Sequence, residues 1–330
     1  MNEKYQELLI QYDIEIHSTF RNKGTFMCET DRGLAMLSEY HSSLNRLAQE
    51  YEWKEALFAA GFTATDRYFV SKEDSLVVYD RYHTPFVLKH YFKGRECDCL
   101  NISDVEGACR NLALLHQAST RVLEAPALHP ESESIADLFG RRNRELKSIR
   151  RYISRVSRKK SFELLYIKHF QKFYDEACHT LNALKDLDNH CYTPESGICH
   201  GAYQHHNILF LPDGSIATVN FESICRQPFL MDFYLFMRKT LEKNHYDHCF
   251  FETGLRAYSS VRPVTDGDLL FLYFLFLYPE KFWKISNRYF NRRKSWVSPK
   301  MEEKLNALLE QDADRQRFLS ILKSRLPSFG

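Results

Sequence analysis

The segment from Cys199 to Glu222 constrains the fold of this 330-residue chain more than any other stretch. Two β-prone runs, HNILFL and SIATVNF, flank the sequence Pro-Asp-Gly, which is typical of the turn in a β-hairpin. The loop before the hairpin carries His200 and Asn207, and Asn220 lies where the second run ends. The sequence therefore predicts a polar loop that leads into a short hairpin with polar side chains at both of its ends.

This layout resembles the catalytic segment of the kinase-like phosphotransferases, the group of the aminoglycoside and choline kinases. In that group the pattern is His-Gly-Asp, four further residues, Asn, and then a hairpin that ends in Asp-Phe-Asp or Asp-Phe-Glu. Here His200 and Asn207 keep their places, whereas Ala202 stands at the position of the first Asp and Asn220 at that of the second. The frame is intact, and two of its carboxylates are missing.

The resemblance implies a chemistry for each position. Phosphoryl transfer depends on positioning and charge neutralisation: one Asp orients the acceptor hydroxyl and takes its proton, while the Asn and the second Asp hold Mg²⁺. Ala202 has no group that accepts a proton, and Asn220 offers only a neutral oxygen. Glu222 lies two residues further, so on a strand it would face the same side as Asn220 and offer a carboxylate to a cation. The candidate metal ligands are Asn207, Asn220 and Glu222, and the alternative is a surface hairpin with ordinary polar residues.

The sequence pattern of the first 92 residues predicts a single α+β unit. Strand patterns cover 14–20, 25–29, 34–40, 67–70, 75–79 and 85–92, and helical patterns cover 3–10 and 45–60. This order is that of the small lobe of a kinase-like fold, whose third strand carries the nucleotide-binding lysine. Here that strand reads LAMLSEY, so the equivalent position is Ser38, or Ala35 in the other register. Glu50 and Glu52, the candidate partners of the missing lysine, are therefore expected to be surface charges.

A hinge at residues 93–98 precedes helical patterns at 104–118, 134–158, 162–187, 230–243, 246–258, 266–278, 279–291 and 299–322. The predicted fold class is α+β, a bilobal protein-kinase-like fold of the aminoglycoside phosphotransferase type. Its small, β-rich N-terminal lobe is predicted at 1–92, and its large helical C-terminal lobe, which holds the degenerate catalytic loop, at 93–330. Phe92, next to the hinge, is the candidate contact for a nucleotide base.

Three further residues are assigned by their place in this fold. Asp232, near the start of a helix, resembles the buried Asp that braces the catalytic loop, although an Asp in the first turn is also a favourable charge for a helix. His116 ends an apolar helical face and is expected to be a core histidine beneath the loop. His205 is expected to be a surface residue, and the alternative is an imidazole that replaces the base missing at Ala202.

Composition and charge exclude several classes of protein. The chain has 45 Lys and Arg against 43 Asp and Glu, which gives no reason to expect binding of nucleic acid. The longest apolar run, Leu269–Tyr278, is too short to span a bilayer and predicts a buried helix. The N-terminus lacks the apolar core of a secretory signal, and the nine scattered cysteines predict reduced thiols. Basic residues are in excess between Arg141 and Lys160, which indicates either a docking face for an acidic partner or a solvated helix face.

Three stretches narrow the resemblance: FKGRECD at 92–98, DFYLFMRKTLEKN at 232–244 and YPEKFWKISNRYFN at 278–291. They are similar to stretches of the CotS-type spore-coat proteins of spore-forming Firmicutes, which are kinase-like relatives of the aminoglycoside phosphotransferases. The resemblance of the chain to these proteins extends over residues 5–325. The resemblance implies a spore-coat pseudokinase that acts as a structural or interaction protein, is made in the cytoplasm and has coat proteins as partners.

No cofactor is expected at such a site, and ATP with Mg²⁺ is expected to bind weakly at most. The sequence does not specify a small-molecule ligand. Two alternatives remain open at this point. One is an active small-molecule kinase in which Glu222 or His205 replaces the missing carboxylates. The other is a module that holds a nucleotide or a sugar without turnover.

Overall fold

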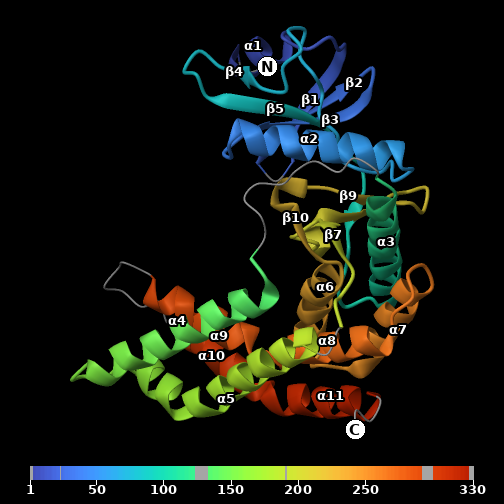
Figure 1. The fold of residues 1–330 in the computed structure, drawn as a ribbon. Coiled ribbons are helices and arrows are strands. Elements are labelled where there is room, and N and C mark those ends of the chain that lie inside the picture. Colours follow the sequence, from blue (N-terminus) through green and yellow to red (C-terminus); the bar gives the residue numbers. More distant parts are fainter. Residues whose placement is uncertain (1–2, 23, 123–132, 190–191, 292–299, 327–330) are drawn as a thin grey trace. The chain divides into compact units, whose positions relative to one another are not determined.

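The computed structural model describes residues 3–22, 24–122, 133–189, 192–291 and 300–326 (Figure 1). The chain forms two compact units. Unit 1 comprises Met1–Glu131, Ser196–Phe236 and Gly254–Arg262, and unit 2 comprises Ser132–Glu195, Met237–Thr253 and Pro263–Gly330. The predicted loop and hairpin lie entirely within unit 1.

A five-stranded antiparallel sheet with the order β1-β2-β3-β5-β4 begins unit 1. Its elements are α1 (Glu3–Leu9), β1 (Ile16–Asn22), β2 (Thr25–Thr30), β3 (Gly33–Glu39), α2 (Leu44–Ala59), β4 (Val78–Tyr79) and β5 (Pro85–His90). Leu9 of α1 belongs to one buried cluster with Leu88, whereas Leu47 of α2 belongs to another with Val87. Because successive strand residues point to opposite faces, α1 and α2 cover opposite faces of this sheet.

The rest of unit 1 contains the predicted hairpin. β8 (Ile208–Phe210) and β9 (Ile216–Thr218) pair antiparallel, which confirms the hairpin, and β6 (Arg95–Glu96) adds a third strand beside β8. β7 (Ser196–Cys199) pairs with β10 (Cys225–Pro228). The helix α3 (Ile102–Arg121) and two short 3₁₀ turns, η1 (His205–Asn207) and η2 (Phe221–Ser223), complete the surroundings of the loop.

Unit 2 is helical in the part that the structure describes. It contains α4 (Ile135–Arg155), α5 (Ser161–Asn189), α8 (Asp266–Leu277), α9 (Glu280–Phe290), α10 (Lys300–Glu310) and α11 (Asp312–Ser324), while α6 (Leu230–Lys243) and α7 (His248–Ser259) each contribute residues to both units. Tyr278 donates a hydrogen bond to Asn143 at 3.0 Å, and the ring N–H of Trp283 donates to Glu145 at 2.7 Å. The distinctive stretch at 278–291 therefore fastens α9 to α4.

Several predicted elements differ from the structure. Residues 67–70 are not a regular strand: Phe69 donates to Leu88 and His90 donates to Arg67 along β5, and only the isolated bridge of Tyr68 to Lys89 forms there. The helix predicted at 299–322 is two helices, since α10 ends at Glu310 and α11 begins at Asp312.

The expectation that Asn220 and Glu222 lie on the same face of a strand is also wrong. β9 ends at Thr218, Asn220 adopts a left-handed conformation with φ 64° and ψ 61°, and Glu222 lies in η2. Asn is one of the few residues other than glycine that tolerate this conformation. Because the chain turns at Asn220, the side chains of Asn220 and Glu222 do not share the face of a strand.

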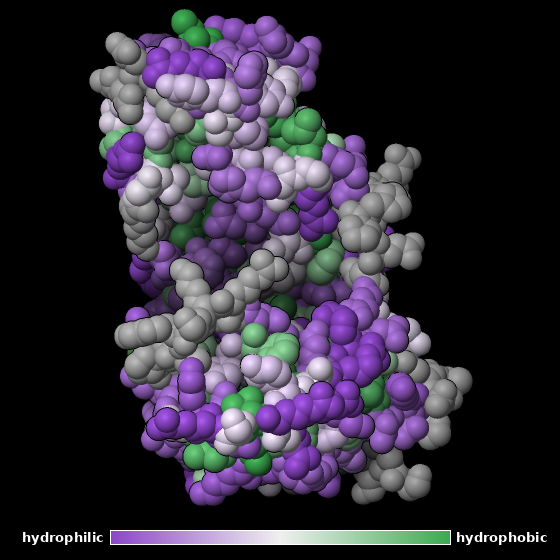
Figure 2. Space-filling view, turned by 90° about the vertical axis from the view of Figure 1, so that its left-hand side faces the viewer, coloured by the Kyte–Doolittle hydropathy of each residue, from purple (hydrophilic) through white to green (hydrophobic). Residues whose placement is uncertain are grey.

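Apolar side chains are mostly internal. Figure 2 shows one face that is largely hydrophilic, on which hydrophobic residues form only small groups. Within α8, Leu272 and Leu275 are fully buried, so the longest apolar run of the sequence is a buried helix, as predicted. Among the described residues, no helix has the length and apolar character needed to cross a membrane.

Candidate functional site

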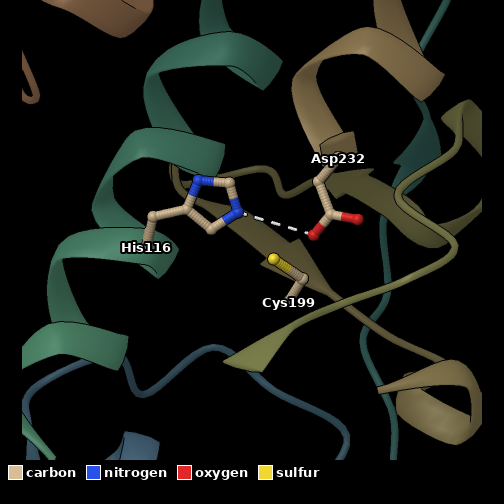
Figure 3. A group of neighbouring side chains, drawn as sticks. All are labelled: His116, Cys199 and Asp232. Carbon is tan, nitrogen blue, oxygen red and sulfur yellow. Dashed lines mark hydrogen bonds and ion pairs between the residues drawn. The ribbon is translucent and has the colours of Figure 1, made fainter. Parts of the chain in front are cut away.

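Asp232 holds the loop that precedes the hairpin. Its carboxylate is fully buried and accepts hydrogen bonds from the backbone N–H of His200 at 2.7 Å and of Gly201 at 2.9 Å. One carboxylate oxygen also lies 3.4 Å from Nε2 of His116 (Figure 3). The Nδ1 of His116 lies 2.9 Å from the hydroxyl of Tyr258. This network has the geometry expected for the bracing Asp and for a core histidine.

Together with Cys199, His116 and Asp232 form a group of residue types that bind metals, and their ligand atoms lie within 4.8 Å of one another (Figure 3). The Sγ of Cys199, however, contacts the carbonyl oxygen of Gln227 at 3.5 Å, and the carboxylate oxygens already accept backbone N–H groups. Burial raises the pKa of the Cys199 thiol well above its usual value, whereas a metal binds the thiolate. This group is therefore a structural network and does not suit a metal ion.

The loop leaves no space for a side chain at Gly201. Its φ is +73°, and a Cβ there would lie 2.0 Å from the carbonyl oxygen of Ser223. Tyr203, which is fully buried, donates a hydrogen bond to the carbonyl oxygen of Ala108 at 2.8 Å and accepts one from Asn111 at 3.1 Å. The loop is thus pinned to α3 on one side and lies against the turn after the hairpin on the other.

His200 has a defined hydrogen-bonding role. Its Nε2 lies 3.0 Å from the carbonyl oxygen of Val219, and its Nδ1 accepts the backbone N–H of Ala202 at 3.2 Å. Only the neutral imidazole with a proton on Nε2 satisfies both contacts. Burial lowers the pKa of His200, which agrees with this neutral form.

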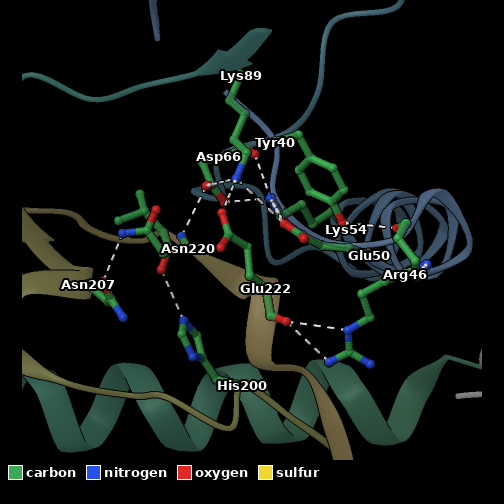
Figure 4. A network of polar contacts seen from close by, with 12 residues as sticks. Tyr40, Arg46, Glu50, Lys54, Asp66, Lys89, His200, Asn207, Asn220 and Glu222 are labelled. Carbon is green, nitrogen blue, oxygen red and sulfur yellow. Dashed lines mark hydrogen bonds and ion pairs between the residues drawn. The ribbon is translucent and has the colours of Figure 1, made fainter. Parts of the chain in front are cut away.

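The structure brings Asn207 and Asn220 together. The Nδ2 of Asn220 donates to the Oδ1 of Asn207 at 2.8 Å, and the Nδ2 of Asn207 donates to the carbonyl oxygen of Ala202 at 2.9 Å (Figure 4). The backbone N–H of Asn220 donates to Asp66 at 3.0 Å. The two candidate metal ligands therefore bind each other through their side-chain amides.

This donor set does not fit Mg²⁺. The ion requires an octahedron of oxygen ligands and usually takes one or two carboxylates from the protein. The Oδ1 of Asn207 already accepts a hydrogen bond, and Asn220 brings no charge. Glu222 points elsewhere, because its carboxylate lies 3.3 Å from the Nζ of Lys89 (Figure 4).

Three charged residues beside the loop were not identified from the sequence: Lys54 of α2, Asp66 and Lys89 of β5. The Nζ of Lys54 lies 2.6 Å from Glu50 and 2.8 Å from the carboxylate of Asp66, and all three side chains are fully buried (Figure 4). The expectation that Glu50 is a surface charge is therefore wrong, whereas Glu52 is exposed. The signal in the sequence was the Glu-to-Lys spacing of four residues on a helix.

Lys89 places an ammonium group on β5, whereas the resemblance implied a lysine on the third strand, β3. Ser38 lies on β3 opposite Val87 of β5, and Lys89 lies opposite Met36. Lys89 is 1% exposed, and its Nζ is 3.9 Å from Glu50 and 3.8 Å from Asp66. Burial lowers its pKa, but the three nearby carboxylates outweigh that effect, so the pKa of Lys89 is raised. A lysine within the apolar run FVLKH was the available signal.

Arg46 ties α2 to the turn that contains Glu222. Its guanidinium donates to the carbonyl oxygen of Glu222 at 3.3 Å and also to that of Ile224 (Figure 4). The backbone of η2 is therefore held by α2, while the Glu222 side chain is 54% exposed.

Phe92 lines a pocket of about 490 Å³ in unit 1. The pocket lies between strands of the five-stranded sheet, the segment 91–96 and the hairpin, and its lining residues are Phe20, Asn22, Met27, Glu29, Leu34, Tyr91, Phe92, Lys93, Gly94, Arg95, Glu96 and Leu209. A pocket that combines aromatic and aliphatic side chains with polar groups is typical of a small-molecule site.

The histidines of the loop lie in η1. His205 is half-buried and His206 is exposed, and their rings meet edge to face with centroids 5.3 Å apart. The backbone carbonyl of His205 accepts a hydrogen bond from Cys97 at 3.2 Å.

The sheet, the braced loop and the hairpin define the fold of a kinase-like phosphotransferase. The chain is similar to an aminoglycoside phosphotransferase from Alicyclobacillus acidocaldarius, with a TM-score of 0.83 and 18% identity over 97% of this chain and 96% of that chain. It is also similar to a microcompartment-associated aminopropanol kinase, with a TM-score of 0.64 and 18% identity over 98% and 99% of the two chains. A choline kinase from Streptococcus pneumoniae has a TM-score of 0.52 and 12% identity over 96% and 97%. These similarities confirm the predicted fold class.

A family model described as spore coat putative kinase YutH matches residues 5–322. The chain therefore belongs to this family, which confirms the resemblance to kinase-like spore-coat proteins. A search of curated proteins gave no match.

Proposed function

We propose that this protein is a pseudokinase of the spore coat: a kinase-like fold with a degenerate phosphotransferase site that acts as a structural or interaction protein. It would be made in the cytoplasm and would join the coat through contacts with other coat proteins. The family description supports the location, and the geometry of the loop supports the absence of phosphoryl transfer.

The observation that carries this proposal is the amide pair of Asn207 and Asn220. A catalytic site of this class needs a metal ligand at each of these positions and a base at the position of Ala202. Here the two amides satisfy each other, and the methyl group of Ala202 cannot take a proton. Loss of a general base alone slows an enzyme by roughly 10²–10⁴-fold.

Two further contacts argue against an active site in which Glu222 or His205 replaces the missing carboxylates. The carboxylate of Glu222 faces an ammonium group at 3.3 Å, so it is not available to a substrate hydroxyl in this arrangement. The ring of His205 packs against that of His206.

Titration calorimetry of the full chain with ATP, with and without Mg²⁺, tests the proposal. We expect weak binding that Mg²⁺ changes by less than about threefold, because the site offers the ion no suitable carboxylate. The double variant Ala202→Asp with Asn220→Asp is the matched control and is expected to gain Mg²⁺-dependent binding. A micromolar, strongly Mg²⁺-dependent affinity of the parent chain, or phosphate transfer at about 1 s⁻¹ or faster, would refute the proposal.

For the contact with a coat partner we propose the basic stripe of α4, which is formed by Arg144, Lys147, Arg151 and Arg155. These residues are three or four positions apart, so they lie along one face of the helix, and all four are exposed. Within the described part of the chain, no carboxylate lies within ion-pair distance of any of them. Arg150 differs, since its guanidinium lies 4.8 Å from the ring centre of Phe170. A row of exposed cations fits an acidic surface of another coat protein.

Charge reversal tests the basic stripe. A fluorescent fusion of the variant Lys147→Glu, Arg151→Glu and Arg155→Glu is expected to lose its recruitment to the forming spore in a spore-forming host. The control reverses three exposed lysines of unit 2 with the same change in net charge: Lys300, Lys304 and Lys323. Equal recruitment of both variants would show that the stripe is only a solvated face.

A further inference from the structure

Two of the three stretches that narrow the resemblance contribute to a charged cluster in unit 2. The stretch 232–244 forms most of α6, and the stretch 278–291 forms most of α9. The ion pairs of these two helices and of α4 join seven residues: Arg142, Arg238, Lys239, Glu242, Glu280, Lys281 and Lys284. All seven belong to unit 2, and the function proposed above uses none of them.

Glu242 of α6 is shared by three cations. It forms an ion pair with Arg238, one turn earlier on the same helix. Its carboxylate also lies 3.7 Å from the Nζ of Lys239 and 3.8 Å from that of Lys281 on α9. One negative charge therefore faces three positive charges.

Glu280 of α9 is shared by two further cations. It forms an ion pair with Arg142 and lies 3.1 Å from the Nζ of Lys284. The guanidinium of Arg142 is also stacked on Trp283, with its central carbon 4.1 Å from the ring centre. Among the described residues, the three lysines of the cluster have no other carboxylate within ion-pair distance. Five cations thus share two carboxylates, which leaves three positive charges in excess.

The members of the cluster differ in their access to solvent. The side chains of Arg238, Glu242 and Glu280 are 8%, 9% and 3% exposed. Those of Lys239 and Lys284 are 46% and 48% exposed. The carboxylates are therefore enclosed, and an anion that arrives from solvent meets the two lysines first.

The electrostatics of these two lysines are unfavourable without a further anion. Burial lowers the pKa of Lys239, and the neighbouring cations Arg238 and Lys284 lower it further. Burial also lowers the pKa of Lys284, and Arg238 and Arg142 add to this effect. In both cases the nearby carboxylate does not compensate for burial and for the like charges. An anion bound beside these lysines would supply the negative charge that the cluster lacks.

The interior of the cluster has no room for such an anion. Arg238, Glu242, Glu280 and Lys281 line a cavity of about 20 Å³. A cavity of this size holds about one water molecule. A larger anion therefore binds on the outer side, where the exposed lysines lie.

We propose that this cluster is a binding site for a doubly charged oxyanion, the phosphate group of a ligand. Lys239 and Lys284 contact the phosphate oxygens, and the enclosed guanidinium groups of Arg142 and Arg238 add to the positive field. The proposal does not depend on the proposed function, because the degenerate loop belongs to unit 1 and the site needs no phosphoryl transfer.

The excess charge favours a phosphate over a carboxylate. A phosphate group carries a charge of about −1.5 to −2 at neutral pH and offers three acceptor oxygens, and lysine is a common ligand for it. A single carboxylate would compensate only one of the three excess charges. Free inorganic phosphate and the phosphate of an ester share this chemistry.

The experiment is a calorimetric titration of the full chain at constant ionic strength and about pH 7.5, with inorganic phosphate, phosphoserine and acetate as probes. We expect phosphate to bind with a dissociation constant of about 1 mM or below, as two charge-assisted hydrogen bonds allow, and acetate to bind about tenfold more weakly. The double variant Lys239→Gln with Lys284→Gln should weaken phosphate binding about tenfold. The control Lys300→Gln with Lys304→Gln makes the same change in net charge at exposed positions of α10 and should leave it unchanged.

Thermal unfolding supplies a second measurement. Phosphate should raise the midpoint of the parent and of the control, and it should raise that of the double variant much less. The double variant is expected to fold, because Glu242 retains Arg238 and Glu280 retains Arg142.

Three results would overturn the proposal: phosphate binding to the parent weaker than about 10 mM, acetate binding as tight as that of phosphate, or an equal loss in the double variant and the control. Phosphoserine separates the two sources. If it binds as tightly as phosphate, the site accepts an ester, and if phosphate alone binds, the site takes the free anion; either result supports the proposal.

Discussion

The brace at Asp232 gives the most direct stability prediction. Replacement of Asp232 by Ala leaves the backbone N–H groups of His200 and Gly201 buried without an acceptor, and it removes the carboxylate from His116. Each unpaired buried donor costs about 1–3 kcal/mol, so we expect unit 1 to lose about 3–5 kcal/mol. Asp232→Asn retains one acceptor oxygen and should lose about 1–3 kcal/mol by the same reasoning.

Tryptophan fluorescence can report on unit 1 alone. The chain has three tryptophans, of which Trp53 is buried in α2 of unit 1 and Trp283 lies in unit 2, while Trp296 is outside the described residues. In a background with phenylalanine at positions 283 and 296, urea unfolding should follow Trp53. A loss of about 3–5 kcal/mol would lower the midpoint by about 1–2 M urea.

The control for this experiment is Asp213→Ala in the exposed turn of the hairpin. Asp213 also accepts a backbone N–H, that of Ser215 at 2.9 Å, but in solvent. The urea midpoint of Asp213→Ala should lie less than about 0.3 M below that of the parent, because water replaces the lost acceptor. If Asp232→Ala shifts the midpoint no further than this control, the bracing role assigned to Asp232 is refuted.

Three further predictions follow from the same part of unit 1. Lys54→Met leaves Glu50 and Asp66 buried without their closest cation, so unit 1 should lose about 3–5 kcal/mol of stability in urea unfolding at pH 7. Burial lowers the pKa of His200 below its value in the unfolded chain. The contribution of His200 to the free energy of unfolding is therefore fully present above about pH 6.5 and is lost as the pH falls. His200→Gln should weaken this pH dependence, which thermal unfolding at several pH values measures. Asn220→Asp places a carboxylate against the Oδ1 of Asn207 and should lower stability by about 1–2 kcal/mol in EDTA, with recovery when Mg²⁺ is added; an equal stability in EDTA would contradict the amide pairing.

The loop and the hairpin could be predicted because their signals are local. The turn sequence, the spacing of His200 and Asn207, and the position of Asp232 at the start of a helix all lie within short stretches. Backbone pairing of β8 with β9 and the burial of Asp232 follow from these features. The conformation of Asn220 was not predicted, because a left-handed residue at the end of a strand leaves no distinct pattern in the sequence.

The charged cluster could not be predicted because its members meet through tertiary packing. Lys89 and β3 are distant in the chain but adjacent in the sheet, where Met36 lies opposite Lys89. A search for the lysine on the third strand therefore could not find it. The burial of α2 shows the same difficulty, since the apolar Leu44 is 57% exposed whereas the charged Glu50 is fully buried. Buried charges that neutralise one another break the apolar periodicity on which such predictions depend.

The site separates into two groups of residues with different physical roles. Asp232, His200 and Tyr203 satisfy their polar atoms within the protein, so the folded loop depends on them whether or not a substrate is present. A carboxylate at position 220 would lie near Asp66, which accepts the backbone N–H of Asn220 at 3.0 Å, and without a metal ion the two charges would repel. The neutral side chain of Asn220 therefore stabilises the metal-free fold. Under the proposed function, in which the fold serves contacts with other proteins, a neutral residue at this position has no cost.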